Sequence, residues 1–207
     1  MIISALHKFV FVAVPKTGTH AVRRALREHM GAEDMEQVGL FVQREFPMPE
    51  LARIGHGHLR LEQVRPYFNA EEWGSFFKFA FVRNPFDRFI SYCAFMTRIE
   101  GKFERHPQAV MRDLIANPPP YHVLFQPQHT FVTGPYGELM TDFIGRVETM
   151  QESYGEIARR IGIPITTLER VNASKRLDYR QYYDSQDLID GVAKLYGRDL
   201  ELFGYEF

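Results

Sequence analysis

Two short apolar runs, each followed at once by a chain break and a helical pattern, constrain the fold of this 207-residue chain most strongly. The runs are Lys8–Val14 and Phe76–Val82, and both are almost continuous in β-branched and aromatic residues. Such runs are typical of strands buried on both faces, as in a parallel sheet. Because parallel strands need a crossover between them, a helix after each strand favours an α/β fold with a central, mostly parallel sheet flanked by helices.

The first break, Pro15–Gly18, leads into a segment whose apolar side chains recur every three or four residues. This spacing predicts an amphipathic helix. We expect the arginine pair Arg23 and Arg24 to lie on its solvated face, and we expect the same of Arg159 and Arg160 on a later helix. The predicted buried face of the first helix consists of Val22, Ala25, Leu26, His29 and Met30.

The second break begins with Arg83 and continues into Asn84 and Pro85. Asparagine is favoured at the N-cap of a helix and proline at its first position, so a helix is predicted to start here. Its buried stripe is predicted to consist of Phe86, Phe89, Ile90 and Cys93.

The C-terminal part, from about residue 141 to residue 207, is predicted to be mostly helical. Three prolines within Asn117–Tyr121 make the most loop-like stretch, which we expect to separate this part from the two strand–helix units. At roughly 150 residues per domain, residues 1–207 are expected to form one domain. The predicted elements are a strand over 141–145, a helix over 150–161 and a helix over 185–196.

Composition excludes several classes of protein. The chain has 25 Lys and Arg against 26 Asp and Glu, which excludes a polycation that binds nucleic acid. Cys93 is the only cysteine, so an internal disulfide and a Cys-rich zinc site are excluded. The apolar runs are far shorter than the ~20 residues of a transmembrane helix, and the first residues lack the basic region of a signal peptide. We therefore expect a cytoplasmic protein.

The segment Val14–His20, VPKTGTH, offers several groups that bind anions. A helix that starts here presents unpaired N–H groups and the positive end of its dipole. Gly18 allows close approach of the backbone and Lys16 adds a positive charge, while Thr17 and Thr19 add hydroxyl donors. The segment does not match the nucleotide-binding pattern GxxxxGK(S/T), because its lysine precedes the glycine. It predicts either a site for a phosphate-like group or an ordinary turn with a surface lysine.

Arg83 follows the second strand, as the Pro-Lys turn follows the first. Ligands of open parallel sheets bind beyond the carboxyl ends of strands, so both strand ends could face one crevice. Arg83 can bind a phosphate through two parallel hydrogen bonds, and Ser91, two helical turns on, can donate from the same side. The alternative is that Arg83 pairs with Asp87 and that Ser91 only faces solvent.

Together the two motifs resemble those of the sulfotransferases. Residues 15–20 resemble the loop that holds a 5′-phosphosulfate. Residues 81–92, FVRNPFDRFISY, resemble the motif in which an Arg, and a Ser eight residues later, hold the adenosine 3′-phosphate. More narrowly, the chain resembles the carbohydrate sulfotransferases of the heparan 2-O and chondroitin type and their small bacterial relatives, whose ending is similar to residues 171–205.

The resemblance implies a P-loop-like, three-layer fold and the donor 3′-phosphoadenosine 5′-phosphosulfate (PAPS), which leaves as adenosine 3′,5′-bisphosphate (PAP), without a metal ion. His20 stands where many members have Ser or Thr, so its role is open. The implied ligands are Lys16, Thr17, Gly18, Thr19 and His20 for the 5′-phosphosulfate, Arg83 and Ser91 for the 3′-phosphate, and Asn172, Ser174 and Lys175 in a segment that closes over the nucleotide.

Two histidines, His56 and His58, flank a single glycine. As residues they suit a metal site or a polar loop, and no nearby Cys or carboxylate completes a set of metal ligands. The resemblance implies a third role, because relatives of the heparan 2-O type carry a His-Gly-His whose second histidine is the general base. It implies that His58 deprotonates the acceptor hydroxyl and that His56 supports it or orients the substrate.

The sequence thus predicts a bacterial sulfotransferase that moves a sulfuryl group from PAPS to a hydroxyl, on a carbohydrate, by in-line transfer. One alternative is a P-loop-like kinase, which the absent magnesium carboxylate disfavours. The other is a non-catalytic protein that binds a nucleotide or glycan on the same fold. The acceptor's identity and the oligomeric state are not defined.

Two further segments are expected to have structural roles. Gln126–Thr130 is expected to pack as a loop or to line the acceptor cleft. The aromatic tail 202–207 is expected to pack against the rest of the chain as a docked C-terminus.

Overall fold

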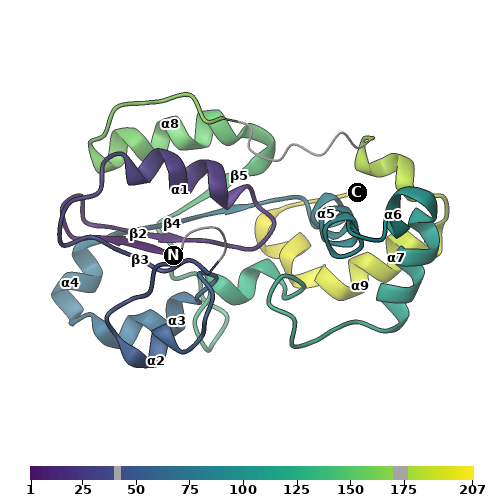
Figure 1. Cartoon of the computed structure of the whole chain (residues 1–207), viewed down its shortest axis with the longest axis horizontal. Helices are drawn as coiled ribbons and strands as arrows, with labels where there is room; N and C mark the ends of the chain where they lie inside the picture. The colour runs from purple at the N-terminus through teal and green to yellow at the C-terminus, as the bar shows by residue number, and fades with distance from the viewer. Residues whose placement is uncertain (40–42, 170–176) are drawn as a thin grey trace. The chain divides into compact units, whose positions relative to one another are not determined.

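A computed structural model describes residues 1–39, 43–169 and 177–207 of the chain (Figure 1). The chain divides into two compact units. The first unit consists of Met1–Val82 and Thr130–Val171, and the second of Arg83–His129 and Asn172–Phe207. The expected boundary at the Pro-rich stretch was wrong, because that stretch lies inside the second unit and the chain returns to the first unit after it.

Within the described residues, five strands of the first unit form one sheet in the order β3-β1-β2-β4-β5. β2 (Phe9–Val12) pairs in parallel with β4 (Phe77–Val82), and β4 pairs in parallel with β5 (Phe143–Arg146). β1 (Ile2–Ser4) is antiparallel to both β2 and β3 (Met35–Glu36). β2, β3, β4 and β5 therefore run in one direction, which confirms the mostly parallel sheet.

Helices flank both faces of this sheet, as Figure 1 shows. α1 (Thr19–Arg27) and α8 (Met150–Ile161) lie on one face. The opposite face carries three short helices, which gives the unit the predicted three layers. They are α2 (Pro49–Ala52), α3 (Leu61–Val64) and α4 (Ala70–Ser75).

Phenylalanine rings fill the layer between the sheet and the helices α1 and α8. Alternate residues of a strand face the same side, so Phe9 and Phe11 of β2 lie beside Phe79 and Phe81 of β4. All four are at most 2% exposed, and the rings of Phe11 and Phe79 stack at 5.4 Å. Burial of each such ring contributes roughly 1.5–3 kcal/mol to folding. The helices add Val22, Ala25, Leu26, Tyr154, Ile157, Ala158 and Ile161 to this core.

The second unit has its own aromatic core, built around α5 (Pro85–Met96) and α9 (Gln186–Phe203). α5 begins as predicted, since the Asn84 side chain accepts a hydrogen bond from the Phe86 N–H at 3.0 Å. The C-terminal Phe207 packs against Phe86, with ring centroids 5.0 Å apart, so the tail docks as expected. The unit also contains α6 (Lys102–Arg105), α7 (Pro107–Ala116) and the 3₁₀ turn η4 (Tyr179–Tyr182), and the turn η2 (Gln128–Phe131) begins in it.

The predicted elements fit the structure to different degrees. The helix predicted over 150–161 coincides with α8, and the strand predicted over 141–145 is β5, displaced by a residue or two. The last helix was predicted to end at Tyr196. There the backbone does leave helical geometry, with φ −124°, but α9 continues beyond this kink to Phe203.

Arg23 contradicts the prediction that the Arg23–Arg24 pair is solvated. Its side chain is buried, and its Nη2 donates to the carbonyls of Gln37 and Gly57 at 3.3 and 3.0 Å. Burial lowers the pKa of Arg23 to about 10, so the guanidinium remains charged near neutral pH, with the Glu36 carboxylate 3.8 Å away. Helical spacing alone does not reveal these partners, because they come from other segments.

The other three arginines agree with the prediction. Arg24 is 62% exposed and pairs with Glu169 at 2.6 Å. Arg159 and Arg160 are also largely exposed, and both pair with Glu156.

The contrast between the two neighbouring arginines can be tested by chemical denaturation. Arg23→Leu should lower the free energy of unfolding by about 2–4 kcal/mol, because the buried carbonyls lose a donor and Glu36 loses a charged neighbour. Arg24→Leu is the matched control on the same helix and should change it by at most ~1 kcal/mol. Equal effects of the two substitutions would contradict the burial of Arg23.

Candidate active site

The loop that joins β2 to α1 has an unusual backbone. Lys16 and Gly18 both adopt the left-handed conformation, with φ of 67° and 71°. For a lysine this conformation is uncommon and costs of the order of 1–2 kcal/mol. Residues held in such conformations cluster at functional sites, which directs attention to Lys16.

Thr17 fixes this loop from inside. Its side chain is buried, and its Oγ1 donates to the Val14 carbonyl at 2.9 Å. The hydroxyl proton is therefore used within the loop, and the expected role of Thr17 as a hydroxyl donor to a ligand was wrong. The backbone N–H is the group that Thr17 can offer. Thr19, at the start of α1, is also buried.

The N-terminus of α1 is arranged for an anion. Gly18 is its N-cap, and among the described residues no side chain caps this end and no acidic residue lies in its first turn. The N–H groups of the first turn and the positive end of the helix dipole are suited to an anion. The positive φ of Gly18 favours glycine, whereas a Cβ there would meet only Cε of Met150, the end of a flexible side chain, at 2.7 Å.

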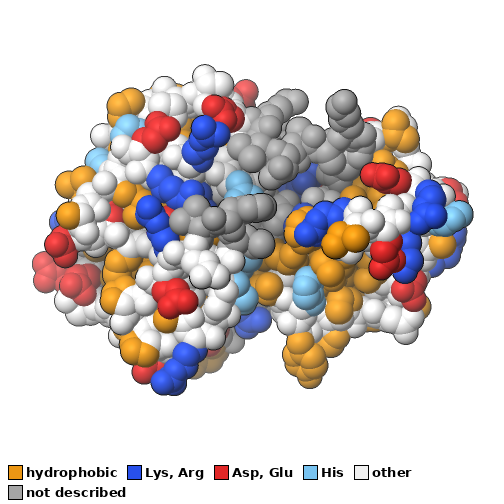
Figure 2. Space-filling model, in the orientation of Figure 1, with side chains coloured by type: hydrophobic (Ala, Val, Ile, Leu, Met, Phe, Trp, Pro, Cys, Tyr) orange, Lys and Arg blue, Asp and Glu red, His pale blue; other side chains and the backbone are white. Residues whose placement is uncertain are grey.

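Positive charge surrounds this end of the unit. Figure 2 shows Lys and Arg side chains gathered over α1. His20 is half-buried in the first turn of α1, and its pKa is lowered by burial and by the charges of Arg23, Arg27 and Lys16. The region therefore favours a negatively charged ligand, and His20 is held in its neutral form.

His58 lies directly beside the same loop. Its Nδ1 is 2.6 Å from the carbonyl oxygen of Ala13, one residue before Val14. A carbonyl oxygen can only accept, so Nδ1 carries the proton and Nε2 of the neutral ring carries a lone pair. Burial, more than any charge nearby, lowers the pKa of His58 to about 3. The ring is thus neutral above that pH, with its lone pair on Nε2, and is a weaker base than an exposed histidine.

His56 and Gly57 hold His58 from the other side. Nδ1 of His56 accepts the backbone N–H of His58 at 3.3 Å. A Cβ on Gly57 would overlap the Gln37 carbonyl and the Arg23 guanidinium. The glycine between the histidines is therefore explained by close packing.

In the second unit, Arg83 directly follows β4. Its Nε and Nη2 both contact Oδ2 of Asp87, at 2.7 and 2.5 Å. The pairing that the sequence left as an alternative is thus present in the structure. Ser91 is half-buried on α5, two turns after Arg83. The remaining predicted ligands, Asn172, Ser174 and Lys175, lie outside the described residues.

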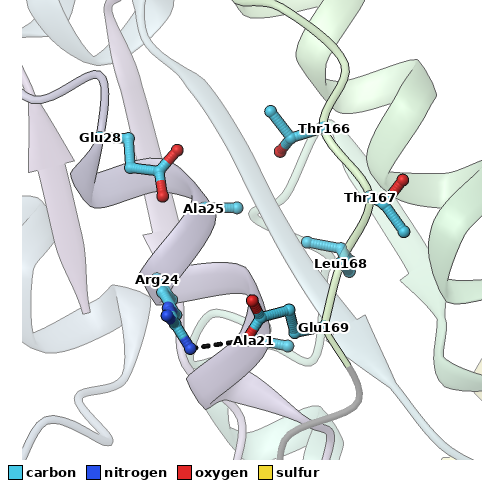
Figure 3. A pocket seen from close by; sticks show the side chains of 8 residues that line it. All are labelled: Ala21, Arg24, Ala25, Glu28, Thr166, Thr167, Leu168 and Glu169. Carbon is cyan, nitrogen blue, oxygen red and sulfur yellow. Dashed lines mark hydrogen bonds and ion pairs between the residues drawn. The ribbon is translucent and has the colours of Figure 1, made fainter.

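Two further observations concern other kinds of site. Within residues 1–39, 43–169 and 177–207, no three His, Cys, Asp or Glu side chains are grouped closely enough to hold a metal ion. Figure 3 shows a pocket between α1 and residues 166–169, bordered by the Arg24–Glu169 ion pair. At about 70 Å³ it is well below the roughly 300 Å³ at which small-molecule sites begin.

Comparison with known proteins agrees with the motifs. A profile described as the sulfotransferase family matches residues 1–206. The chain belongs to the sulfotransferase family. An uncharacterised protein of Archaeoglobus fulgidus is similar to this sulfotransferase, with 27% identity over 103 residues, which is 50% of this chain and 82% of that protein. No solved structure gives a significant match.

Two residues of this sulfotransferase have contacts or positions that the sequence did not predict: Arg146, and Gln128 within the segment Gln126–Thr130. Arg146 ends β5 and is the register partner of Val82, so it places a third cation at the carboxyl edge of the sheet. The available signal was that Arg146 directly follows the strand predicted over 141–145, as Arg83 follows the second strand. Gln128 is fully buried, and its side chain binds the backbone N–H and carbonyl of Arg83. No local sequence pattern predicts such a contact.

Gly18→Ala tests the loop of the sulfotransferase. We expect PAP affinity to fall roughly tenfold or more, equivalent to about 1.4 kcal/mol, because a Cβ at the positive φ of Gly18 strains the loop and displaces the N–H groups at the start of α1. Gly162→Ala is the matched control, since Gly162 has φ 73° but open space around it. The Gly162→Ala substitution should introduce similar backbone strain and leave PAP affinity unchanged. Calorimetric titration measures both, and equal PAP affinities in the two variants would contradict the loop assignment.

Proposed function

We propose that this sulfotransferase takes its sulfuryl group from PAPS and transfers it to a hydroxyl of a carbohydrate. The observation that carries the proposal is the loop between β2 and α1. It combines a left-handed lysine and a left-handed glycine with a helix N-terminus whose N-cap is Gly18 and whose first turn contains no acidic residue. These are the groups that a 5′-phosphosulfate needs, namely N–H donors and a cation.

Each part of the donor has partners of suitable chemistry in the proposal. Lys16 and the backbone of residues 17–20 bind the 5′-phosphosulfate. Arg83 binds the 3′-phosphate through its guanidinium, and Ser91 donates its hydroxyl to the same group. Asn172, Ser174 and Lys175 keep the nucleotide-closing role that the resemblance implies.

The chemistry then requires one base and one stabiliser of negative charge. PAPS supplies the sulfuryl group and leaves as PAP. Nε2 of His58 takes the proton of the acceptor hydroxyl, while the bond from Nδ1 to the Ala13 carbonyl keeps the ring in the required tautomer. Lys16 and the N–H groups of α1 stabilise the charge on the departing oxygen. The ring of His56 orients His58 by accepting the backbone N–H of His58.

The carbohydrate acceptor is supported by the resemblance of the motifs to carbohydrate sulfotransferases. We further propose that residues 1–207 act as a single catalytic domain, which the family match over residues 1–206 supports. No helix in the described parts of the chain is long and apolar enough to cross a bilayer. The cytoplasmic location and the bacterial source stay predictions.

Calorimetry with PAP, and with ATP and Mg²⁺, tests the donor class. We expect PAP to bind, and we expect Arg83→Ala to weaken it about 10- to 100-fold, because a charge-assisted hydrogen bond contributes roughly 1.5–3 kcal/mol. Arg198→Ala is the control in the same unit, since Arg198 is 52% exposed and pairs with Glu201, and it should bind PAP as the wild type does. Preference for ATP with Mg²⁺ would instead indicate phosphoryl transfer.

His58→Ala tests the base. We expect kcat to fall roughly 10²-fold or more, with PAP affinity retained, because proton removal is lost while the donor site remains. The assay is PAP release from PAPS with the most active acceptor of a panel of simple sugars. His56→Ala should give a smaller loss. A His58→Ala variant with wild-type turnover would favour a non-catalytic role, and one that also lost PAP affinity would remove His58 from the base role.

The pH profile gives an independent check of the same residue. Burial lowers the pKa of His58 to about 3, so its basic form persists as the pH falls from 7 to 5. We therefore expect no acidic limb of kcat/KM from His58 in this range. If His58 had the ordinary pKa of about 6.5, kcat/KM would fall about thirtyfold by pH 5, and that result would contradict the half-buried, neutral His58.

A further inference from the structure

We propose that Gln128 and Asp199 are positioning residues that hold Arg83 in place for the nucleotide 3′-phosphate. The inference rests on the proposed function, because it assumes that Arg83 binds this phosphate. It goes beyond that function in naming the groups that pre-organise Arg83, and neither group belongs to the two motifs.

Gln128 holds the backbone of Arg83 at two points. Its Oε1 accepts the Arg83 N–H at 2.9 Å, and its Nε2 donates to the Arg83 carbonyl at 2.8 Å. The side chain is 0% exposed, so these bonds form away from water. Val82 is the last residue of β4, and Arg83 therefore lies just beyond the strand ladder. One amide side chain there supplies the donor and the acceptor that a neighbouring strand would otherwise supply.

Asp199 anchors Gln128 in turn. Oδ2 of Asp199 accepts the Gln128 N–H at 2.7 Å, and Oδ1 accepts the backbone N–H and Nδ1 of His129 at 2.8 and 2.7 Å. Asp199 lies on α9 and is 0% exposed. A buried carboxylate is costly unless it is hydrogen-bonded, and three donors offset that cost here. The contacts run from α9 through Gln128 to the main chain of Arg83.

The side chain of Arg83 is oriented by a third group. Nε and Nη2 both contact Oδ2 of Asp87, so one edge of the guanidinium faces this carboxylate. The Nη1–Nη2 edge is then the one that can bind a phosphate through two parallel hydrogen bonds. With its backbone held by Gln128 and one edge held by Asp87, Arg83 loses little conformational freedom on binding. Such pre-organisation raises affinity without a new ligand contact.

The test measures discrimination for the 3′-phosphate, which a general loss of stability does not change. Calorimetry gives the affinities for PAP and for AMP, which lacks the 3′-phosphate, and their ratio isolates that phosphate. Gln128→Met keeps the size of the side chain and removes both bonds to Arg83. We expect the ratio to fall about tenfold, with AMP affinity unchanged and the fold intact by circular dichroism.

Three further variants make the test specific. In the Arg83→Ala background, Gln128→Met should change the ratio less than twofold, because a positioning residue has no effect without the residue that it positions. Gln126→Met is the matched control, since the Gln126 side chain donates to the Pro120 carbonyl of the neighbouring loop, and it should keep the wild-type ratio. If Gln128→Met fails to fold, Asp199→Asn replaces it and should lower the ratio in the same way.

The outcomes separate the inference from the function on which it rests. A folded Gln128→Met or Asp199→Asn variant with the wild-type ratio overturns the inference and leaves the proposed function intact. An additive effect of Gln128→Met in the Arg83→Ala background also overturns it, because the effect then does not pass through Arg83. A wild-type protein that binds PAP no better than AMP overturns the proposed role of Arg83, and the inference with it.

Discussion

The parallel pairing of β2 with β4 is the interaction on which the rest of this sulfotransferase depends. Its register, from Phe9 opposite Phe77 to Val12 opposite Ala80, stacks aromatic rings on the face that α1 and α8 cover. Since the strands are parallel, both end at the same edge of the sheet. There one chain segment continues into the Lys16 loop and the other into Arg83. Because the strands are parallel, both candidate anion-binding segments begin at this edge.

The groups that stabilise the first unit also shape its candidate site. Arg23 is buried against the carbonyls of Gln37 and Gly57, and Gly57 separates the two histidines. The Ala13 carbonyl, at the end of the core strand β2, sets the tautomer of His58. The histidine pair is therefore positioned by main-chain carbonyls and buried packing. Burial keeps His58 neutral, and the positive charge of Arg23 lowers its pKa further.

Prediction from sequence succeeded where local pattern was strong. β2 and β4 are nearly continuous apolar runs, α8 has clear helical periodicity, and Asn84 is a cap with a local partner. β1 and β3 have three and two residues, which is too few for periodicity, and they form because β1 pairs with the edge of β2 and β3 pairs with β1. Within the candidate site, the hydroxyl of Thr17, the burial of Arg23 and the clamp of Gln128 on Arg83 depend on partners that no local spacing reveals.

A crystal structure of the protein with PAP bound is the most direct test of the central claim, that the two strand ends receive the two phosphates of one nucleotide. The account predicts the 5′-phosphate within hydrogen-bond distance of Lys16 and the first N–H groups of α1. It also predicts the 3′-phosphate on the Nη1–Nη2 edge of Arg83, with Gln128 still bound to the Arg83 backbone. A nucleotide seated with either phosphate away from these groups would contradict it.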